Sequence, residues 1–315
     1  MARSAWLVVF ALTVTLTAVL AAPAAIASAA TGGAPTPAGA PPPPPSRGGT
    51  PDAAPSAGSG LTLLSAATSP RKSFYYGVRY PRLTYTIASD QPQNDLRIDV
   101  IDEAGETVKS FFRNDIAPNV ADSIRWDGTR SDKRPAANGR YSFRIVPQNG
   151  GPAARRARSA TSSSGEPFVL SFDLYGYAFP VLGAHDFGSS GARFGAGRSG
   201  HSHEGQDVMA KCGTPLVAAR GGQVRYSGYQ GSAGNYLVID GKGTGFDTAY
   251  MHLLEPSPLQ EGDAVRTGQP IGLVGETGNA QGCHLHFEIW TAPGWYEGGS
   301  PIDPLPYLQR WDAYS

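Results

Sequence analysis

Residues 284–289 read His-Leu-His-Phe-Glu-Ile, and this short run decides how the rest of the chain is interpreted. Successive side chains of a β-strand point to opposite faces, so His284 and His286 would share one face of a strand. The intervening Leu, Phe and Ile side chains would form the opposite, apolar face, which suits a protein core. The alternation therefore predicts a strand that carries two imidazoles side by side. Such a pair fits a metal or catalytic site, but it also fits two surface histidines on an edge strand.

Two further stretches carry residues of the same chemical types. Residues 203–207 place His203 and Asp207 four positions apart, and the neighbouring glycines favour a loop over a helix. His252 lies in the Tyr-Met-His-Leu run of residues 250–253. Two neutral imidazoles and one carboxylate are a typical ligand set of a catalytic zinc ion, with the fourth position left to water. Two remaining histidines could accept the proton of that water and stabilise a developing oxyanion.

The order and spacing of these stretches resemble the M23 family of zinc metallopeptidases, of the lysostaphin/LytM type. The resemblance runs from about residue 179 to residue 304. The motifs that carry it are Phe194-Gly195 with Arg198, His203-x-Gly205-x-Asp207, Gly234-Asn235-Tyr236, Tyr250-x-His252-Leu253 and His284-Leu285-His286-Phe287-Glu288. The resemblance implies an antiparallel β-sheet groove, and it implies peptide cross-links of bacterial peptidoglycan as the substrate.

The resemblance also implies a role for each matched residue. The ligands of one Zn²⁺ ion per catalytic domain would be His203, Asp207 and His286. The catalytic histidines would be His284, as the general base, and His252, which would polarise the attacked carbonyl. The substrate groove would include Arg198, Asn235 and Tyr250. His185 and His201 match no ligand of the family, and we expect His201 in an exposed loop.

The first thirty residues have the composition of an export signal. Arg3 supplies a positive start, residues 6–22 are uncharged and apolar, and small residues at 27–30 offer cleavage sites. An uncleaved membrane anchor is the alternative, although this apolar run is near the lower limit for spanning a bilayer. With cleavage, the mature chain would have no transmembrane span. We therefore expect a secreted or cell-wall-associated protein outside the cytoplasm of a bacterium.

The two cysteines, Cys212 and Cys283, flank the motifs of the proposed site. Outside the cytoplasm a close pair of cysteines is more often bridged than free. Closing a loop of about 70 residues would stabilise the fold by about 4 kcal/mol in the chain-entropy model. We expect a disulfide, with two free buried thiols or zinc-binding thiolates as the alternatives.

The remaining chain divides by composition into four further segments. Residues 31–60 are rich in Pro, Ala and Gly and are predicted to be a disordered linker. Residues 61–150 are predicted to form a β-sandwich module, and residues 151–167 a basic linker. Residues 168–315 would be the metallopeptidase domain. The chain as a whole is thus expected to be mainly β, with an antiparallel catalytic sheet after the sandwich.

The predicted sandwich rests on alternating apolar residues in three short runs, 83–87, 96–100 and 141–145. The dipeptide Asn138-Gly139 predicts a hairpin turn before the last of these runs. Residues 126–128 and 138–141 resemble the end of immunoglobulin-like modules such as those of flagellar hook-capping proteins. The module contains no His or Cys, which favours a structural role. It could also contact the groove of the catalytic domain and inhibit the enzyme.

The charge balance excludes one class of function. The chain has 26 Lys and Arg and 26 Asp and Glu, so it lacks the basic surface that nucleic-acid binding requires. The sequence favours an exported zinc-dependent endopeptidase that hydrolyses peptide cross-links of peptidoglycan. The alternative is a non-catalytic LytM-type activator or cell-wall-binding module.

Overall fold

The computed structural model describes residues 61–148, 168 and 170–315 of the chain. The predicted signal segment (1–30) and the two predicted linkers (31–60 and 151–167) lie outside the described residues. The described part is mainly β, as the sequence predicted, and its α-helix is α1 (Leu305–Asp312). Within it, no helix combines the length and the apolar character that crossing a membrane requires.

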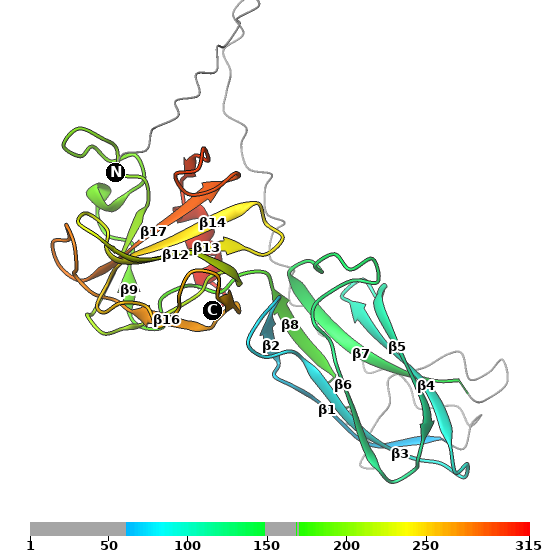
Figure 1. The fold of residues 1–315 in the computed structure, drawn as a ribbon. Helices are drawn as coiled ribbons and strands as arrows, with labels where there is room; N and C mark the ends of the chain where they lie inside the picture. The colour runs from blue at the N-terminus through cyan, green and yellow to red at the C-terminus, as the bar shows by residue number, and fades with distance from the viewer. Residues whose placement is uncertain (1–60, 149–167, 169) are drawn as a thin grey trace, which may run out of the picture. The chain divides into compact units, whose positions relative to one another are not determined.

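The first part of the described chain contains two sheets (Figure 1). One has the strand order β1-β3-β6 and the other β2-β8-β7-β4-β5. Paired strands are antiparallel except β2 and β8, which are parallel. The strands are β1 (Thr62–Ser69), β2 (Lys72–Phe74), β3 (Arg82–Ala88), β4 (Asn94–Asp102), β5 (Thr107–Ile116), β6 (Ala121–Arg125), β7 (Gly139–Pro147) and β8 (Ser171–Tyr175).

One apolar core is shared by these two sheets. It takes alternate side chains from β3 and β4, so the alternation read from residues 83–87 and 96–100 is confirmed. At its centre lies the fully buried Trp126, whose ring is 4.9 Å from that of Tyr141 and 5.8 Å from that of Phe172, centroid to centroid. Two packed sheets around one core agree with a sandwich; the immunoglobulin-like type stays a prediction.

Two details of this part differ from the sequence-based expectation. Asn138-Gly139 does not make the predicted hairpin, because β6 and β7 belong to different sheets. Instead, the side-chain oxygen of Asn138 accepts a hydrogen bond from the N–H of Gly176, at 2.7 Å. Strand β8 lies after residue 168, yet it pairs with β2 and β7. The chain therefore leaves the first pair of sheets after Tyr175, later than the predicted start of the second region.

The second part is built on an eight-stranded antiparallel sheet of order β15-β12-β13-β14-β17-β10-β9, with β18 paired to β17. In Figure 1, β12, β13, β14 and β17 run side by side. The strands are β9 (His185–Asp186), β10 (Gln206–Ala210), β12 (Gly222–Gln230), β13 (Gly234–Gly241), β14 (Phe246–Leu253), β15 (Ala264–Val265), β17 (His284–Thr291) and β18 (Pro301–Ile302). A small separate sheet pairs β11 (Pro215–Val217) with β16 (Pro270–Leu273).

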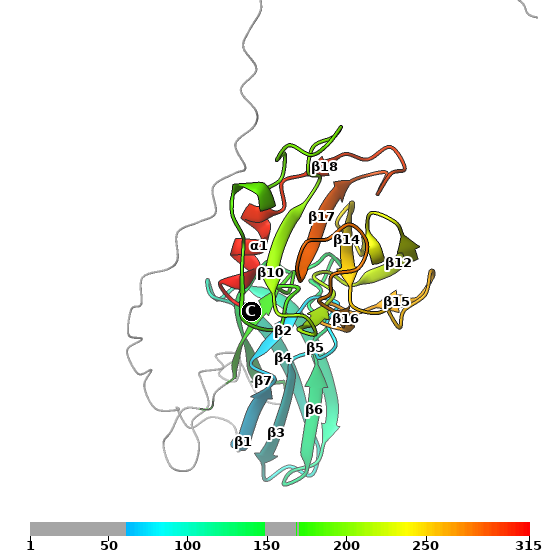
Figure 2. The same cartoon turned by 90° about the vertical axis from the view of Figure 1, so that its left-hand side faces the viewer.

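A second apolar core covers one face of the eight-stranded sheet. Leu285 and Phe287 of β17 are fully buried in it, and Leu308 and Trp311 of α1 pack against the same cluster. Figure 2 shows α1 beside β10 on this side of the fold. Because strand side chains alternate, the opposite face of β17 is left for His284 and its neighbours. The apolar core thus fixes which face can carry polar chemistry.

Hydrogen bonds and a cation–π contact connect described residues of the first part with described residues of the second. The Thr267 side chain donates to the carbonyl of Tyr75 at 2.8 Å, and the Thr267 N–H donates to that of Tyr76 at 2.9 Å. The Arg220 guanidinium lies 4.4 Å from the ring centroid of Tyr75 and donates to the Gly176 carbonyl at 2.6 Å. The predicted inhibitory contact of the module with the groove stays a prediction.

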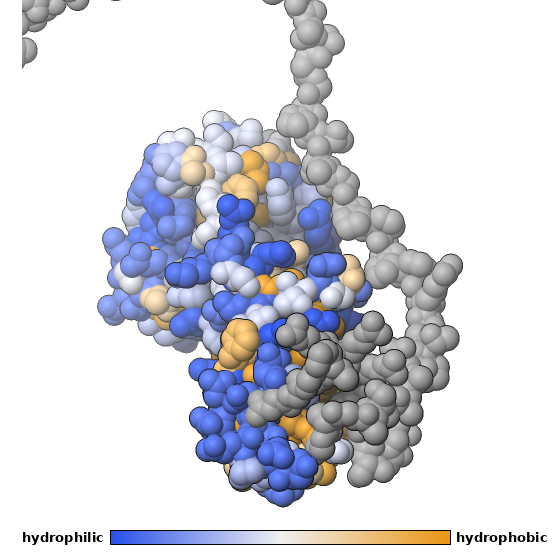
Figure 3. Space-filling view, turned by 90° about the vertical axis from the view of Figure 1, so that its right-hand side faces the viewer, coloured by the Kyte–Doolittle hydropathy of each residue, from blue (hydrophilic) through white to orange (hydrophobic). Residues whose placement is uncertain are grey.

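The surface shown in Figure 3 is predominantly hydrophilic wherever it is formed by described residues. Hydrophobic residues appear there in small groups rather than in a broad patch. This distribution is ordinary for a protein surface in water.

We expect Trp126→Ala to lower the free energy of unfolding by about 3–5 kcal/mol, because it leaves a cavity at the centre of the sandwich core. The matched control is Phe112→Ala, since the Phe112 side chain is 66% exposed and should contribute little. Urea unfolding followed by circular dichroism measures both. Equal stability of the two variants would contradict the described core.

Candidate active site

Strand β17 brings three segments of the chain together on the polar face of the sheet. In β10, Asp207 is the direct cross-strand partner of His286, and in β14 the partner of His286 is Met251. His252 follows at the end of β14, and His203 comes from the loop before β10. The pairing register therefore gathers residues that are up to about eighty positions apart in the sequence.

Three ligand atoms converge at the centre of this face. His203 Nε2 lies 3.0 Å from Asp207 Oδ1 and 2.9 Å from His286 Nδ1, and these last two atoms are 3.0 Å apart. Both imidazoles are buried, with exposed fractions of 6% and 8%. Neighbouring ligands of a tetrahedral ion with bonds of about 2.0 Å are separated by roughly 3.3 Å. The triangle has the size that a small metal ion needs.

The protons of the two imidazoles are directed away from this triangle. We assign the Nδ1–H of His203 to the Arg193 carbonyl at 2.8 Å, which leaves its Nε2 lone pair free. The Nε2–H of His286 donates to Glu288 Oε1 at 2.9 Å, so its Nδ1 faces Asp207. Two nitrogens and one carboxylate oxygen thus point at one place, and this donor set fits a zinc ion.

The electrostatics of the metal-free site agree with a position for a cation. Burial alone would lower the pKa of His286, but the carboxylates of Asp207 and Glu288 outweigh burial and raise this pKa to about 9. Burial would raise the pKa of Asp207, but its contacts with His203 and His286 hold it well below the usual range. Because a zinc ligand must be a neutral imidazole, zinc binding at His286 would compete with its protonation.

His252 and His284 stand beside the triangle with their rings 4.7 Å apart, centroid to centroid. The Nδ1–H of His252 donates to the Thr277 carbonyl, and that of His284 to the Gly282 carbonyl, both at 2.8 Å. Both rings therefore present Nε2 to the site. His284 Nε2 lies 3.6 Å from Asp207 Oδ1. Burial, followed by the nearby His284, lowers the pKa of His252 to about 4.

Local backbone geometry supports this arrangement at two positions. His252 has a φ of 62°, in the left-handed region that non-glycine residues rarely occupy and that often marks functional sites. At Gly205, a Cβ atom would lie 2.7 Å from His286 Nε2 and 2.5 Å from the Phe287 carbonyl oxygen. Glycine at 205 is therefore required for the loop of His203 to pass this close to the ring of His286.

Comparison with known proteins agrees with this geometry. Residues 201–304 match the family model described as peptidase family M23. These residues belong to peptidase family M23. The M23 region, residues 201–304, contains all four site histidines and Asp207.

Known relatives match part of this chain and part of their own length. The chain is 41% identical over 88 residues to the peptidoglycan DD-endopeptidase ShyC of Vibrio cholerae, covering 28% of this chain and 20% of ShyC. It is 34% identical over 152 residues to the lipoprotein NlpD/LppB homolog of Pseudomonas aeruginosa, covering 47% and 45%. The chain thus spans less than half the length of these relatives. Among solved structures, lysostaphin from Staphylococcus simulans is 26% identical with a TM-score of 0.38, covering 44% of this chain and 56% of that one.

The three predicted groove residues lie in different surroundings, and Arg198 lies just before the M23 region. Arg198 is 3.6 Å from Asp207 Oδ2 and donates to the Gly191 carbonyl at 2.9 Å. Asn235 is buried, and its amide donates to the Leu253 carbonyl at 3.2 Å. The expectation for Tyr250 is wrong: its side chain is fully buried in the core on the opposite face, where its hydroxyl accepts the Ala219 N–H at 2.8 Å. Strand alternation places Tyr250 and Met251 on different faces.

Sequence reasoning missed Glu288 as a member of the site. The residue is part of the quoted motif, but no role was assigned to it. Its spacing was the available signal, because a strand that directs His284 and His286 to one face also directs Glu288 there. Of the unmatched histidines, His201 is exposed, as predicted, and His185 lies 3.3 Å from Asp312 of α1.

Cys212 and Cys283 form a disulfide, with Cα atoms 5.2 Å apart. Cys212 follows β10 and Cys283 directly precedes β17, so the bond joins the strand of Asp207 to the strand of His286. A cross-link at this position restrains the separation of the two ligand strands.

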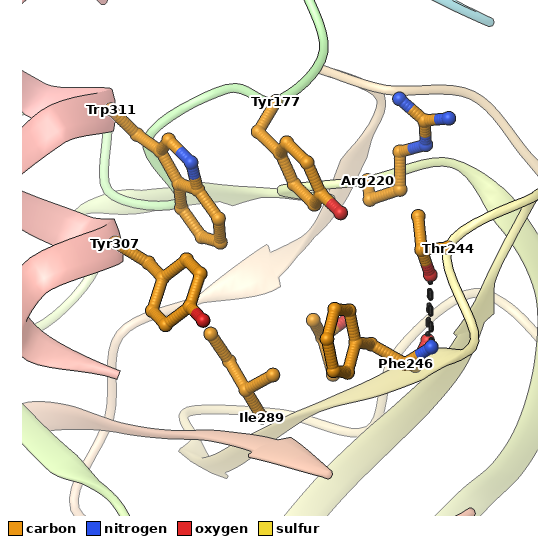
Figure 4. Close-up of a pocket in the computed structure, with 8 residues that line it drawn as sticks. Tyr177, Arg220, Thr244, Phe246, Ile289, Tyr307 and Trp311 are labelled. Carbon is orange, nitrogen blue, oxygen red and sulfur yellow. Dashed lines mark hydrogen bonds between the residues drawn. The ribbon is translucent and has the colours of Figure 1, made fainter. Parts of the chain in front are cut away.

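A small pocket lies on the other face of the sheet, among aromatic side chains (Figure 4). Its volume is about 10 Å³, room for about one water molecule, so it is too small for a peptide. Burial lowers the pKa of Arg220 there, and the guanidinium donates to the carbonyls of Lys242 and Gly176. The pocket is lined by Tyr177, Arg220, Thr244, Phe246, Thr248, Ile289, Tyr307 and Trp311.

We expect thiol titration of the unreduced, denatured protein to find no free thiol, and two thiols per chain after reduction. The reason is the pairing of Cys212 with Cys283, since the sequence has two cysteines. Reduced Cys212→Ser protein, which keeps one thiol, calibrates the assay. Two thiols per chain without reductant would contradict the pairing.

We expect the ring of His252 to titrate near pH 4 in metal-free protein, below the usual value of about 6.5. The unfolded chain binds this proton below about pH 6.5, so the residue's contribution to stability is lost as the pH falls from about 6.5 to 4. Two-dimensional NMR of the imidazole protons, assigned with His252→Gln, measures the titration. A midpoint at or above pH 6.5 would show that the ring is not buried as described.

Proposed function

We propose that this chain is an exported, zinc-dependent endopeptidase that hydrolyses peptide cross-links of bacterial peptidoglycan. The observation that carries the proposal is the convergence of two imidazole nitrogens and one carboxylate oxygen beside two further imidazoles. A relative that is 41% identical over 88 residues is named as a peptidoglycan DD-endopeptidase, which supports the substrate class. The predicted export signal supports a location outside the cytoplasm, secreted or at the cell wall.

The zinc ligands in this proposal are His203 Nε2, Asp207 Oδ1 and His286 Nδ1. A bound zinc ion would polarise the scissile carbonyl and lower the pKa of a water molecule toward about 7. The carbonyl of Arg193 and the carboxylate of Glu288 hold the two imidazoles with their lone pairs toward the ion. Their protein contacts therefore prepare the rings for coordination before any metal arrives.

The two remaining imidazoles handle protons. Because Nδ1 of each ring is held by a backbone carbonyl, each can accept a proton only at Nε2. His284, the nearer to Asp207, accepts the proton of the attacking water and carries it to the leaving amine. His252 has a pKa of about 4, so we propose that it takes up a proton from solvent at Nε2 as negative charge develops on the carbonyl oxygen, and that it donates this proton in a hydrogen bond to that oxygen.

The non-catalytic alternative has no specific observation in its favour. An activator or binding module needs the groove but does not need the full set of four imidazoles and one carboxylate. In this chain the ligand atoms of His203, Asp207 and His286 lie together and the rings of His252 and His284 lie beside them, which supports the catalytic proposal.

We expect His203→Ala and Asp207→Ala to lose bound zinc, and His284→Ala to retain zinc while losing peptidase activity by about 100- to 10,000-fold. The matched control is His201→Ala, an exposed histidine close to His203, which should keep both. Zinc is measured by atomic emission. Activity is measured with the full chain on defined peptidoglycans, with new peptide termini identified by mass spectrometry.

Two results would contradict the proposed function. One is a zinc-loaded wild type that releases no new termini from any defined peptidoglycan. The other is cleavage that continues at the full rate after a chelator has removed the metal. Cleavage of purified cell walls by wild type, stopped by the chelator and restored by added zinc, would support it.

A further inference from the structure

Glu288 has an unusual set of partners for a buried acidic residue. It is 3% exposed, and no Lys or Arg among the described residues contributes to its hydrogen bonds. Oε1 accepts the Nε2–H of His286 at 2.9 Å. Oε2 accepts the indole N–H of Trp290 at 2.7 Å and that of Trp295 at 2.9 Å. All three partners are donors, so in these contacts the side chain of Glu288 acts only as an acceptor.

The loop between β17 and β18 is connected to this carboxylate and also to the segment of His203. The Trp295 indole donates to Glu288, and the Trp295 backbone N–H donates to Asp247 Oδ2 at 2.9 Å. The hydroxyl of the next residue, Tyr296, donates to Glu204. Glu204 directly follows His203 in the chain. One loop therefore contacts Glu288, the hydrogen-bond partner of His286, and Glu204, the residue next to His203 in the chain.

We propose that Glu288 is a positioning residue that sets the zinc affinity of the site through His286, and that Trp295 holds Glu288 in the required place. The inference rests on the proposed function, because it takes zinc as the ligand of His286. A carboxylate that fixes the Nε2–H of an imidazole leaves the lone pair on Nδ1 and increases the basicity of that nitrogen. Without this acceptor, the ring can carry its proton on Nδ1, and that tautomer cannot coordinate zinc.

The rival explanation is purely structural. In that case Glu288 only satisfies the buried indole N–H groups, and its loss would lower stability without changing the affinity of folded protein for zinc. The two explanations differ in the zinc dissociation constant, which is measured on folded protein and does not depend on turnover. They also differ in how substitutions at Glu288 and Trp295 combine.

The test measures zinc affinity of the full chain by competition with a chelating dye, for variants whose folding has been checked by circular dichroism. Glu288→Gln preserves size but places an amide N–H₂ among N–H donors, and we expect zinc binding about 10- to 100-fold weaker. Trp295→Phe keeps an aromatic ring and removes one donor, so we expect a smaller loss of about threefold. Glu255→Gln, an exposed control, should bind like wild type.

The double variant supplies a second readout. If Trp295 acts through Glu288, then Glu288→Gln with Trp295→Phe should bind zinc no more weakly than Glu288→Gln alone. Independent losses that multiply would overturn the role of Trp295. Wild-type affinity in folded Glu288→Gln would overturn the role of Glu288. If Glu288→Gln does not fold, Trp295→Phe decides: threefold weaker binding supports the proposal, and unchanged binding overturns it. A wild type that binds no zinc would instead refute the proposed function.

Discussion

The site depends on one constraint, which is that each imidazole gives one N–H to a fixed acceptor in the protein. Three of the four acceptors are backbone carbonyls, at Arg193, Thr277 and Gly282, and the fourth is the carboxylate of Glu288. A backbone carbonyl can be placed only by folding the loop that contains it. The fold itself therefore sets the direction of each imidazole lone pair. The proposed zinc binding and proton transfer depend on this direction more than on the number of histidines.

The same constraint explains why a β-sheet suits this site. Strand β17 turns its Leu and Phe side chains into a dense core and its two histidines to the other face, so the core cannot repack without moving the ligands. Antiparallel pairing with β10 then places Asp207 directly opposite His286, so regular strand pairing positions both residues. The disulfide between Cys212 and Cys283 joins the two strands beside this pair. The paired strands and the disulfide thus restrain the backbone where Asp207 Oδ1 and His286 Nδ1 lie about 3 Å apart.

Sequence patterns predicted what depends on side-chain alternation and on motif spacing. The buried strands β3 and β4, the shared face of His284 and His286, and the grouping of His203 with Asp207 all follow from such patterns. The errors concern tertiary arrangement, which local patterns do not determine. Asn138-Gly139 was expected to be a hairpin because local turn preference does not reveal which sheet the preceding strand joins. Tyr250 was assigned to the groove from its motif, and alternation would also place it on the face of His252. The left-handed φ of His252 and the register shift between β13 and β14 break that alternation, and neither is visible in the sequence.

For Glu288, the sequence predicts the position of the side chain but not its role. Alternation alone puts a carboxylate on the ligand face, but it does not show whether that carboxylate would bind a metal, contact substrate or hold a neighbour. The partners favour the last role: Oε1 accepts the N–H of His286, Oε2 accepts two indole N–H groups, and Glu288 is not grouped with the candidate metal ligands. Two of those donors are indoles, one of which comes from a loop that also contacts the segment of His203. Under the proposal above, a substitution in that loop would act on the ligands through Glu288 without contacting them, and the loop is not part of the ligand motif.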